Sequence, residues 1–231
     1  MPYYYGFDFS SIIYLLPALL FAVWAQYNVK STFAKYSKVA SDRGMTGYQA
    51  ARLILDANGL THVRVEQIAG DLTDHYDPRA DVIRLSQTVH SVRTAAAVGV
   101  AAHEAGHAVQ YAAGYGPIRL RAAIIPVTNI GSSLSWPLVL LGILLSARPL
   151  AMVGVILFSL TVVFQLLTLP VEFNASRRAL AALKTSGLSA DGVDAAGKVL
   201  RAAALTYAAA LASAIANLLR LLSIVNRNDR R

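Results

Sequence analysis

Three long stretches without a charged side chain divide the sequence. The first holds 21 residues between Asp8 and Lys30. The second holds 26 residues between Arg121 and Arg148, and the third holds 23 residues between Arg148 and Glu172. About 20 apolar residues in a helix cross the hydrocarbon core of a bilayer. The pattern therefore predicts an N-terminal transmembrane helix and, later in the chain, a transmembrane helical hairpin that turns at Arg148.

The first stretch is interpreted as a retained helix rather than a cleaved signal peptide. No basic segment precedes it, and no cleavage site of the A-x-A type follows it. Aromatic residues near its two ends suit the interfacial layers of a bilayer. These residues are Tyr3, Tyr4, Tyr5, Trp24 and Tyr27.

A fourth uncharged segment, 202–219, is rich in alanine and has a different pattern. Polar residues such as Ser213 and Asn217 fall on one helical stripe, and apolar residues such as Leu211 and Ile215 fall on another. This amphipathic pattern predicts a helix that packs on the polar part of the chain or lies at the membrane surface. A spanning helix is the alternative.

The segment 28–121 has the pattern of a small folded region. A capping-box sequence that begins at Thr46 predicts a short helix over 47–58. Two runs rich in β-branched residues predict strands at Val63–Ile68 and Val82–Leu85, with a turn-rich segment between them. Together with the long apolar helices, these elements predict a fold that is mainly α with a small β-sheet.

Composition supports a membrane protein. Hydrophobic residues make up 55% of the 231 residues and charged residues only 15%, whereas soluble domains carry about 25% charged residues. The mean hydropathy is +0.47, which excludes a disordered chain. The absence of cysteine excludes disulfides, thiolate metal sites and cysteine nucleophiles. No nucleic-acid motif accompanies the net charge of +8, so nucleic acid is not an expected partner.

The positions of lysine and arginine predict an orientation. The segment 28–121 and the segment after residue 170 hold nearly all of them, the hairpin tip holds only Arg148, and the first eight residues hold none. Positive residues favour the cytoplasmic side. The N-terminus is therefore expected outside, with the two basic segments in the cytoplasm.

The sequence His103-Glu104-Ala105-Gly106-His107 matches the H-E-x-x-H pattern. It lies in an apolar run that predicts a helix between an N-cap at Ser91 and a stop at Gly114. On a helix, two histidines four residues apart share one face and can bind one zinc ion, while Glu104 can reach a metal-bound water as general base. Charged groups in so apolar a helix would otherwise be buried without a partner.

A third ligand is needed to complete a zinc site. A metzincin would have glycine and histidine where this chain has Gln110 and Ala113, so that class is excluded. Of the two remaining glutamates, Glu66 lies in a predicted strand, and Glu172 follows the third apolar stretch. The hairpin returns Glu172 to the same cytoplasmic face as the histidine helix, and Pro170 fits a kink or the first turn at which a helix restarts. Glu172 is the predicted third ligand, with Asn174 and Ser176 as residues that orient the ligands.

These motifs carry a family resemblance. The sequences HYDPRADVIRLS, HEAGHAVQ and VEFNASRRAL, in this order, resemble the YugP-type family of neutral zinc metallopeptidases, which are bacterial membrane proteins. The resemblance implies a membrane-embedded, gluzincin-like peptidase of the bacterial inner membrane. It implies His103, His107 and Glu172 as zinc ligands and Glu104 as base, and suggests that an edge strand, for which we take Val82–Leu85, holds the substrate.

The resulting hypothesis is an integral membrane zinc endopeptidase that acts on peptides or membrane proteins, alone, as a homo-oligomer or with a membrane partner. His75 and Tyr207 are further candidates for polarising a substrate carbonyl. The alternative is a membrane scaffold or adaptor with a structural zinc and no turnover. The expected regions are an external N-terminus with the first transmembrane helix (1–27), a cytoplasmic catalytic region (28–121), the transmembrane hairpin (122–169), and a third-ligand helix with the amphipathic helix (170–231).

Overall fold

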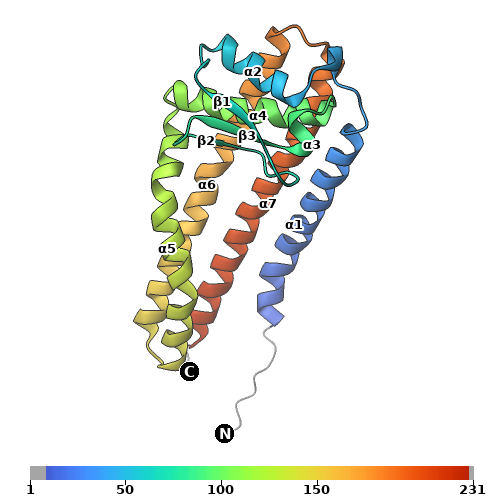
Figure 1. Ribbon diagram of the computed structural model, residues 1–231. Helices are drawn as coiled ribbons and strands as arrows, with labels where there is room; N and C mark the ends of the chain where they lie inside the picture. The colour runs from blue at the N-terminus through green and yellow to red at the C-terminus, as the bar shows by residue number, and fades with distance from the viewer. Residues whose placement is uncertain (1–8, 229–231) are drawn as a thin grey trace. The chain divides into compact units, whose positions relative to one another are not determined.

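The computed structural model describes residues 9–228, so the expectation for Tyr3, Tyr4 and Tyr5 lies outside the described residues. The chain is mostly helical with one small sheet, as the sequence predicts (Figure 1). The long helices are α1 (Phe9–Tyr36), α5 (Gly116–Leu144), α6 (Arg148–Thr185) and α7 (Ala190–Asn228). The shorter elements are η1 (Asp42–Gly44), α2 (Gly47–Ala57), β1 (Arg64–Ile68), β2 (His75–Asp77), β3 (Val82–Ser86), α3 (Gln87–His90) and α4 (Ala95–Ala112).

The chain forms two compact units. The first, which we call the apolar unit, comprises residues 1–24, 121–167 and 207–231. The second, which we call the site unit, comprises residues 25–120 and 168–206 and contains the H-E-x-x-H motif. Four helices of the described chain, α1, α5, α6 and α7, contribute residues to both units.

The apolar unit contains the predicted helical hairpin. Helix α5 ends at Leu144, and α6 begins at Arg148 after a turn in which Ser146 has a positive φ of 54°. Close packing joins the two helices, because a Cβ added to Gly142 would lie 2.3 Å from the backbone nitrogen of Ala151. Their outer surfaces carry exposed large apolar side chains, for example Ile130 (62% exposed). Such a surface is typical of lipid contact.

Helix α7 is longer than the sequence analysis predicted. It is one continuous helix of 39 residues, and it is one of four helices in the described chain that are long and apolar enough to cross a membrane. Its C-terminal part packs within the apolar unit, where Leu221 and Val225 join a core with Val139, Ala151 and Val155. By length and composition, α7 therefore fits the alternative of a spanning helix.

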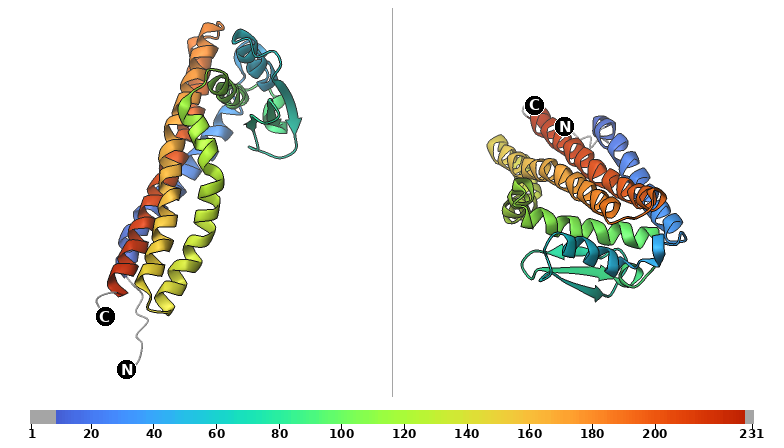
Figure 2. Two further views of the ribbon diagram at one scale, coloured as in Figure 1. Left: turned by 90° about the vertical axis from the view of Figure 1, so that its left-hand side faces the viewer. Right: turned by 90° about the horizontal axis from the view of Figure 1, so that it is seen from above.

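The site unit begins with the predicted capped helix. The Thr46 hydroxyl accepts from the Gln49 backbone, and the Gln49 side chain accepts from the Thr46 backbone, which confirms the capping box of α2. Helix α2 buries Ile54 and Leu55 in the core of this unit. Viewed from above, α4 lies between the sheet and the helices α6 and α7 (Figure 2).

The sheet has the order β1-β3-β2. Strand β3 pairs in parallel with β1 and antiparallel with β2, and β2 lies in the segment predicted as a turn. The prediction of Val82–Leu85 as an edge strand is therefore wrong, because β3 is central and its hydrogen bonds are used on both sides. The sequence pattern identified β3 as a strand but could not show its neighbours.

Helix α6 corrects a second prediction. Pro170 lies inside this helix, which continues without a break from Arg148 to Thr185. A proline in a helix removes one backbone hydrogen bond but does not always end the helix. The third apolar stretch and the Glu172 segment therefore belong to one helix, and no new helix starts at Pro170.

Candidate metal centre

Helix α4 carries the motif through the middle of the site unit. Its N-cap is Thr94, whose hydroxyl accepts from the Ala97 backbone, and not Ser91 as predicted. The short helix α3 ends just before Ser91, which explains the difference. Gly114 has a positive φ of 65° directly after the C-cap and ends the helix as expected. Most of α4 is buried, so its polar residues need partners inside the unit.

Glycines allow α4 to approach its neighbours closely. A Cβ on Gly106, inside the motif, would lie 2.6 Å from the carbonyl oxygen of Ala175 in α6. A Cβ on Gly99 would lie 3.3 Å from the Cα atom of Ala196 in α7. The backbones of α4 and α6 touch at Gly106 and Ala175. The histidines before and after Gly106 therefore lie next to the α6 residues before and after Ala175.

His103, His107 and Glu172 converge at this contact. The Glu172 Oε2 atom lies 3.1 Å from His103 Nε2 and 3.4 Å from His107 Nε2. One ligand atom from each of the three residues lies within 4.8 Å of the others. The two imidazole rings stand nearly perpendicular, at 82°, with centroids 4.7 Å apart. The carboxylate is 3% exposed, and the imidazoles of His103 and His107 are 13% and 12% exposed, so the two rings are the more accessible part of the group.

Each imidazole is oriented through its second nitrogen. His103 Nδ1 lies 3.1 Å from the Ser176 hydroxyl, and His107 Nδ1 lies 3.0 Å from the Gln110 Oε1 atom. If Nδ1 carries the proton and donates to these oxygens, Nε2 of both rings is unprotonated and directed at Glu172. This is the tautomer that metal-binding histidines need.

Gln110 is in turn held by α6. Its side chain is fully buried, and its Nε2 donates to the Val171 carbonyl at 2.8 Å and to the Asn174 Oδ1 at 3.0 Å. The Arg178 guanidinium donates to the same Asn174 oxygen at 2.8 Å. Asn174 therefore orients His107 through Gln110 and does not contact it directly. Ser176 and Asn174 both lie where the sequence analysis expected supporting residues.

Glu104 is buried beside this group, with 8% of its surface exposed. Burial lowers the pKa of His107, but the hydrogen bond to Glu172 and the negative charges of Glu104 and Glu172 raise it, and the net shift is upward. The charge of Glu104 also acts on Asp74. Glu104 therefore lies within electrostatic range of both His107 and Asp74.

Asp74, which precedes β2, was not among the predicted site residues. Its carboxylate accepts from the Ser86 backbone at 2.7 Å and from the Ser86 hydroxyl at 3.0–3.1 Å. Burial raises the pKa of Asp74, the bonds from Ser86 oppose this, and the charge of Glu104 adds to the rise. The signal in the sequence was an aspartate in the HYDP-containing segment, which by itself is typical of a turn.

His75 does not belong to the candidate centre. It is exposed on β2, with Nδ1 2.8 Å from the Thr73 carbonyl and Nε2 3.5 Å from Arg84. The next residue, Tyr76, contacts Tyr111 of α4, with ring centroids 5.7 Å apart. Side chains alternate along a strand, so His75 lies on the face of the sheet away from α4. Tyr207 belongs to the apolar unit, and its proposed role stays a prediction.

Gln110 was also missed as a site residue, although the sequence analysis used it to exclude metzincins. A glutamine three residues after His107 lies on the same helical side, which was the available signal. The sequence could not predict this burial, because the two groups that accept hydrogen bonds from the Gln110 side chain, the Val171 carbonyl and Asn174, lie on α6.

The donor set fits zinc. Zinc prefers imidazole and carboxylate ligands in tetrahedral geometry, with bonds of about 2.0–2.2 Å, which place two ligand atoms about 3.4 Å apart. The observed separations from Glu172 to the two histidines, 3.1 and 3.4 Å, are close to this value. Three protein ligands leave a fourth position for water or substrate, which is the ligand number of catalytic rather than structural zinc sites.

Comparisons with known proteins agree with this description. The model of a family described as "Putative neutral zinc metallopeptidase" matches residues 11–226. The chain is 48% identical over 217 residues to the "Putative membrane protease YugP" of Bacillus subtilis (strain 168), which covers 92% of this chain and 95% of that protein. No solved structure shows a significant match to the chain.

Proposed function

Because the chain belongs to this neutral zinc metallopeptidase family, we propose that it is an integral membrane zinc endopeptidase in which Glu104 is the general base. The observation that carries the proposal is the convergence of His103, His107 and Glu172 next to a buried fourth residue, Glu104, that is not needed as a ligand. A site that only held a structural ion would have no use for this additional buried carboxylate.

The residues divide the chemistry between them. A zinc ion held by His103, His107 and Glu172 would polarise the scissile carbonyl and lower the pKa of a coordinated water. Glu104 accepts the proton of the attacking water and delivers it to the leaving amine. Ser176 and Gln110 keep the two imidazoles in the ligating tautomer. No side chain forms a covalent bond with the substrate in this scheme.

The sheet offers a way to hold the substrate backbone. Within the described chain, β1 and β2 have unpaired edges, and β2 contacts α4 through the ring pair Tyr76–Tyr111. An extended peptide could add to β2 as a further strand, with backbone hydrogen bonds to residues 75–77. Strand addition at β2 would hold the substrate next to α4. In this proposal β2 replaces β3 as the strand that binds the substrate backbone.

We further propose that the site unit faces the cytoplasm and that substrates are peptides or membrane-protein segments near the bilayer. The protein is a membrane protein, and the basic residues of 28–121 support a cytoplasmic position. The orientation is tested by cysteine labelling. The chain has no cysteine of its own, so Arg64→Cys in an exposed strand and Ser146→Cys at the hairpin tip each provide a single label. The proposal requires an impermeant maleimide to label intact cells through Ser146→Cys but not through Arg64→Cys.

The main test separates catalysis from metal binding. Glu104→Gln should retain one zinc per chain by elemental analysis but cleave a broad library of quenched fluorescent peptides about 100 to 10,000 times more slowly, the usual contribution of a general base. Glu66→Gln is the matched control, because Glu66 is a half-buried glutamate paired with Arg64 and Arg84 on the sheet. It should keep both zinc and activity.

The scaffold alternative predicts a different result. A structural zinc site would give wild-type protein that contains zinc and cleaves no peptide in the library or in a membrane-protein mixture. In that case Glu104→Gln would be indistinguishable from the wild type in every assay. If Glu104→Gln protein cleaved peptides as fast as the wild type does, Glu104 would not be the general base. The proposal that the protein is a peptidase would still hold.

A further inference from the structure

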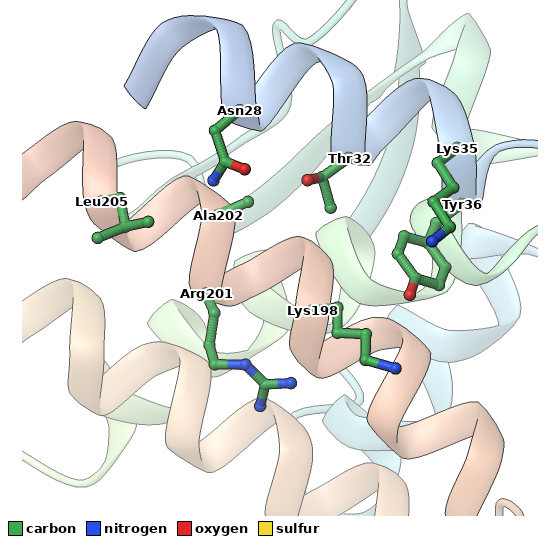
Figure 3. Close-up of a pocket in the computed structure, with 8 residues that line it drawn as sticks. All are labelled: Asn28, Thr32, Lys35, Tyr36, Lys198, Arg201, Ala202 and Leu205. Atoms are coloured by element: carbon green, nitrogen blue, oxygen red, sulfur yellow. The ribbon is translucent and has the colours of Figure 1, made fainter. Parts of the chain in front are cut away.

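A second pocket lies in the site unit, away from the H-E-x-x-H motif. It has a volume of about 280 Å³. Residues from successive turns of α1 and of α7 line it (Figure 3). The α1 residues are Asn28, Thr32, Lys35 and Tyr36, and the α7 residues are Lys198, Arg201, Ala202 and Leu205. None of the metal-centre residues lines it.

The pocket is cationic, and its charges are held in place. Three of the lining residues are basic, and none is acidic. Among the residues that the structure describes, the carboxylate that pairs with the lining is that of Asp194, which lies 2.6 Å from Lys198 and 3.4 Å from Arg201. Three cations against one carboxylate leave two net positive charges. Lys35 lies over the Tyr36 ring, 5.6 Å from its centroid, and Lys198 also interacts with the Tyr36 hydroxyl.

Polarity changes along the pocket in one direction. Lys35, Tyr36 and Lys198 lie together at one end, Asn28 and Leu205 lie at the other, and Thr32 and Arg201 lie between them (Figure 3). Asn28 lies near the end of the long uncharged stretch of α1, next to Tyr27, which is 73% exposed. An exposed tyrosine at the end of an apolar helix is typical of the membrane–water interface. The apolar end of the pocket is therefore the end nearer the bilayer.

From this arrangement we infer that the pocket binds the phosphate of an anionic phospholipid, with the headgroup at the cationic end and the glycerol and first acyl carbons beside Leu205. The cations complement a phosphate diester, and the hydroxyl and amide groups of Thr32 and Asn28 complement its ester oxygens. Basic pockets at the cytoplasmic ends of membrane helices are suited to anionic headgroups, which are concentrated in that leaflet. This inference uses the membrane assignment and the proposed cytoplasmic position of the site unit, but it does not depend on peptidase activity.

The test uses full-length protein in a non-ionic detergent. Native mass spectrometry would count bound short-chain lipid during titration with dioctanoyl phosphatidylglycerol, with dioctanoyl phosphatidylcholine, and with phosphatidylglycerol in the presence of inorganic phosphate or a polyglutamate peptide. We expect preferential binding of phosphatidylglycerol that inorganic phosphate and the peptide displace only at large excess. Equal binding of phosphatidylcholine, or displacement by equimolar phosphate or peptide, would overturn the lipid assignment.

Variants locate the binding. Lys198→Gln combined with Arg201→Gln should weaken phosphatidylglycerol binding about 25-fold, because each basic residue near an anionic surface contributes roughly fivefold. Thr32→Glu keeps all the cations and should also weaken binding, which guards against a folding defect in the double variant. Lys30→Gln combined with Lys184→Gln removes the same charge from exposed positions outside the lining. An equal loss of binding in this control pair would show diffuse attraction and contradict the pocket.

Discussion

The two units bury their apolar residues by different means. In the site unit, large side chains such as Leu55, Ile83 and Leu183 are completely buried in a conventional core. In the apolar unit, residues of the same type, such as Leu20 and Ile156, are each 60% exposed. A soluble protein would not expose so many large apolar residues on its helices. The difference is what is expected when the helices of the apolar unit contact lipid, whereas the site unit buries its apolar residues in its own interior.

Helix α6 shows the same contrast within one element. Its first part, in the apolar unit, exposes Val163 and Leu166, whereas its second part, in the site unit, buries the polar residues Glu172 and Asn174. Buried polar groups need partners, and α4 supplies them as His103, His107 and Gln110. The helix thus changes from a lipid-facing element to one wall of the candidate metal centre.

The largest effect is expected from removing the buried carboxylate of Glu172 in the site-unit part of α6. Glu172→Ala should lower zinc affinity by more than about 100-fold, because loss of a direct ligand exceeds the 10- to 100-fold effect of a supporting residue. Chelator competition measures the affinity. Glu66→Ala, on the exposed face of the sheet, should leave it unchanged. If Glu172→Ala protein bound zinc as tightly as the wild type does, Glu172 would not be a zinc ligand.

A pair of core substitutions tests the difference in solvent directly. Leu183→Ala creates a cavity in the site unit and should reduce the free energy of unfolding by about 2–5 kcal/mol. Ile156→Ala, on the exposed surface of the apolar unit, should change it by less than about 0.5 kcal/mol. Unfolding by SDS in mixed micelles, followed by circular dichroism, measures both. Similar losses from the two variants would break the comparison.

A weaker effect should follow from removing the support of one imidazole. Gln110→Ala deletes the acceptor for His107 and leaves the Val171 carbonyl without this donor, so zinc affinity should fall by about 10- to 100-fold. Gln67→Ala removes an exposed glutamine from β1 and provides the control. Unchanged affinity in Gln110→Ala protein would mean that the His107 ring is oriented by the helix alone.

The smallest effect concerns pH and two aspartates near β2. Burial raises the pKa of Asp74, so the folded state binds its proton more tightly than the unfolded state does. Its contribution to stability is complete below its ordinary pKa of 3.8 and is lost as pH rises through the raised value. The hydrogen bond from Arg84 lowers the pKa of Asp77, so that its contribution is present above pH 3.8 and is lost as pH falls through the lowered value.

Asp74→Asn and Asp77→Asn should therefore change the pH dependence of unfolding in opposite directions. Relative to wild type, the free energy of unfolding of Asp74→Asn should increase as pH rises from about 4 towards neutrality. Relative to wild type, that of Asp77→Asn should decrease as pH rises from strongly acidic values towards about 4. Thermal unfolding in detergent at several pH values measures the two differences. Parallel changes in both variants would show that the two carboxylates do not differ in environment.

Local patterns in the sequence predicted much of the fold. The charge-free stretches predicted α1 and the hairpin, and the capping box predicted α2, because these features depend on residues close together in the chain. The central position of β3, the strand β2 and the continuity of α6 through Pro170 were not predicted. The two features of the sheet depend on pairing between separate segments of the chain, because β3 pairs with both β1 and β2.

The candidate site divides in the same way. The sequence alone determined that His103, Glu104 and His107 share one turn of a buried helix, and it reduced the choice of an acidic ligand to two glutamates. Only the tertiary structure decided that Glu172 joins them, that Gln110 and Ser176 orient the rings, and that His75 faces away. The physical reason is that spacing along a helix sets which side chains share a face, whereas the contact of Gly106 with Ala175 sets which other helix that face meets.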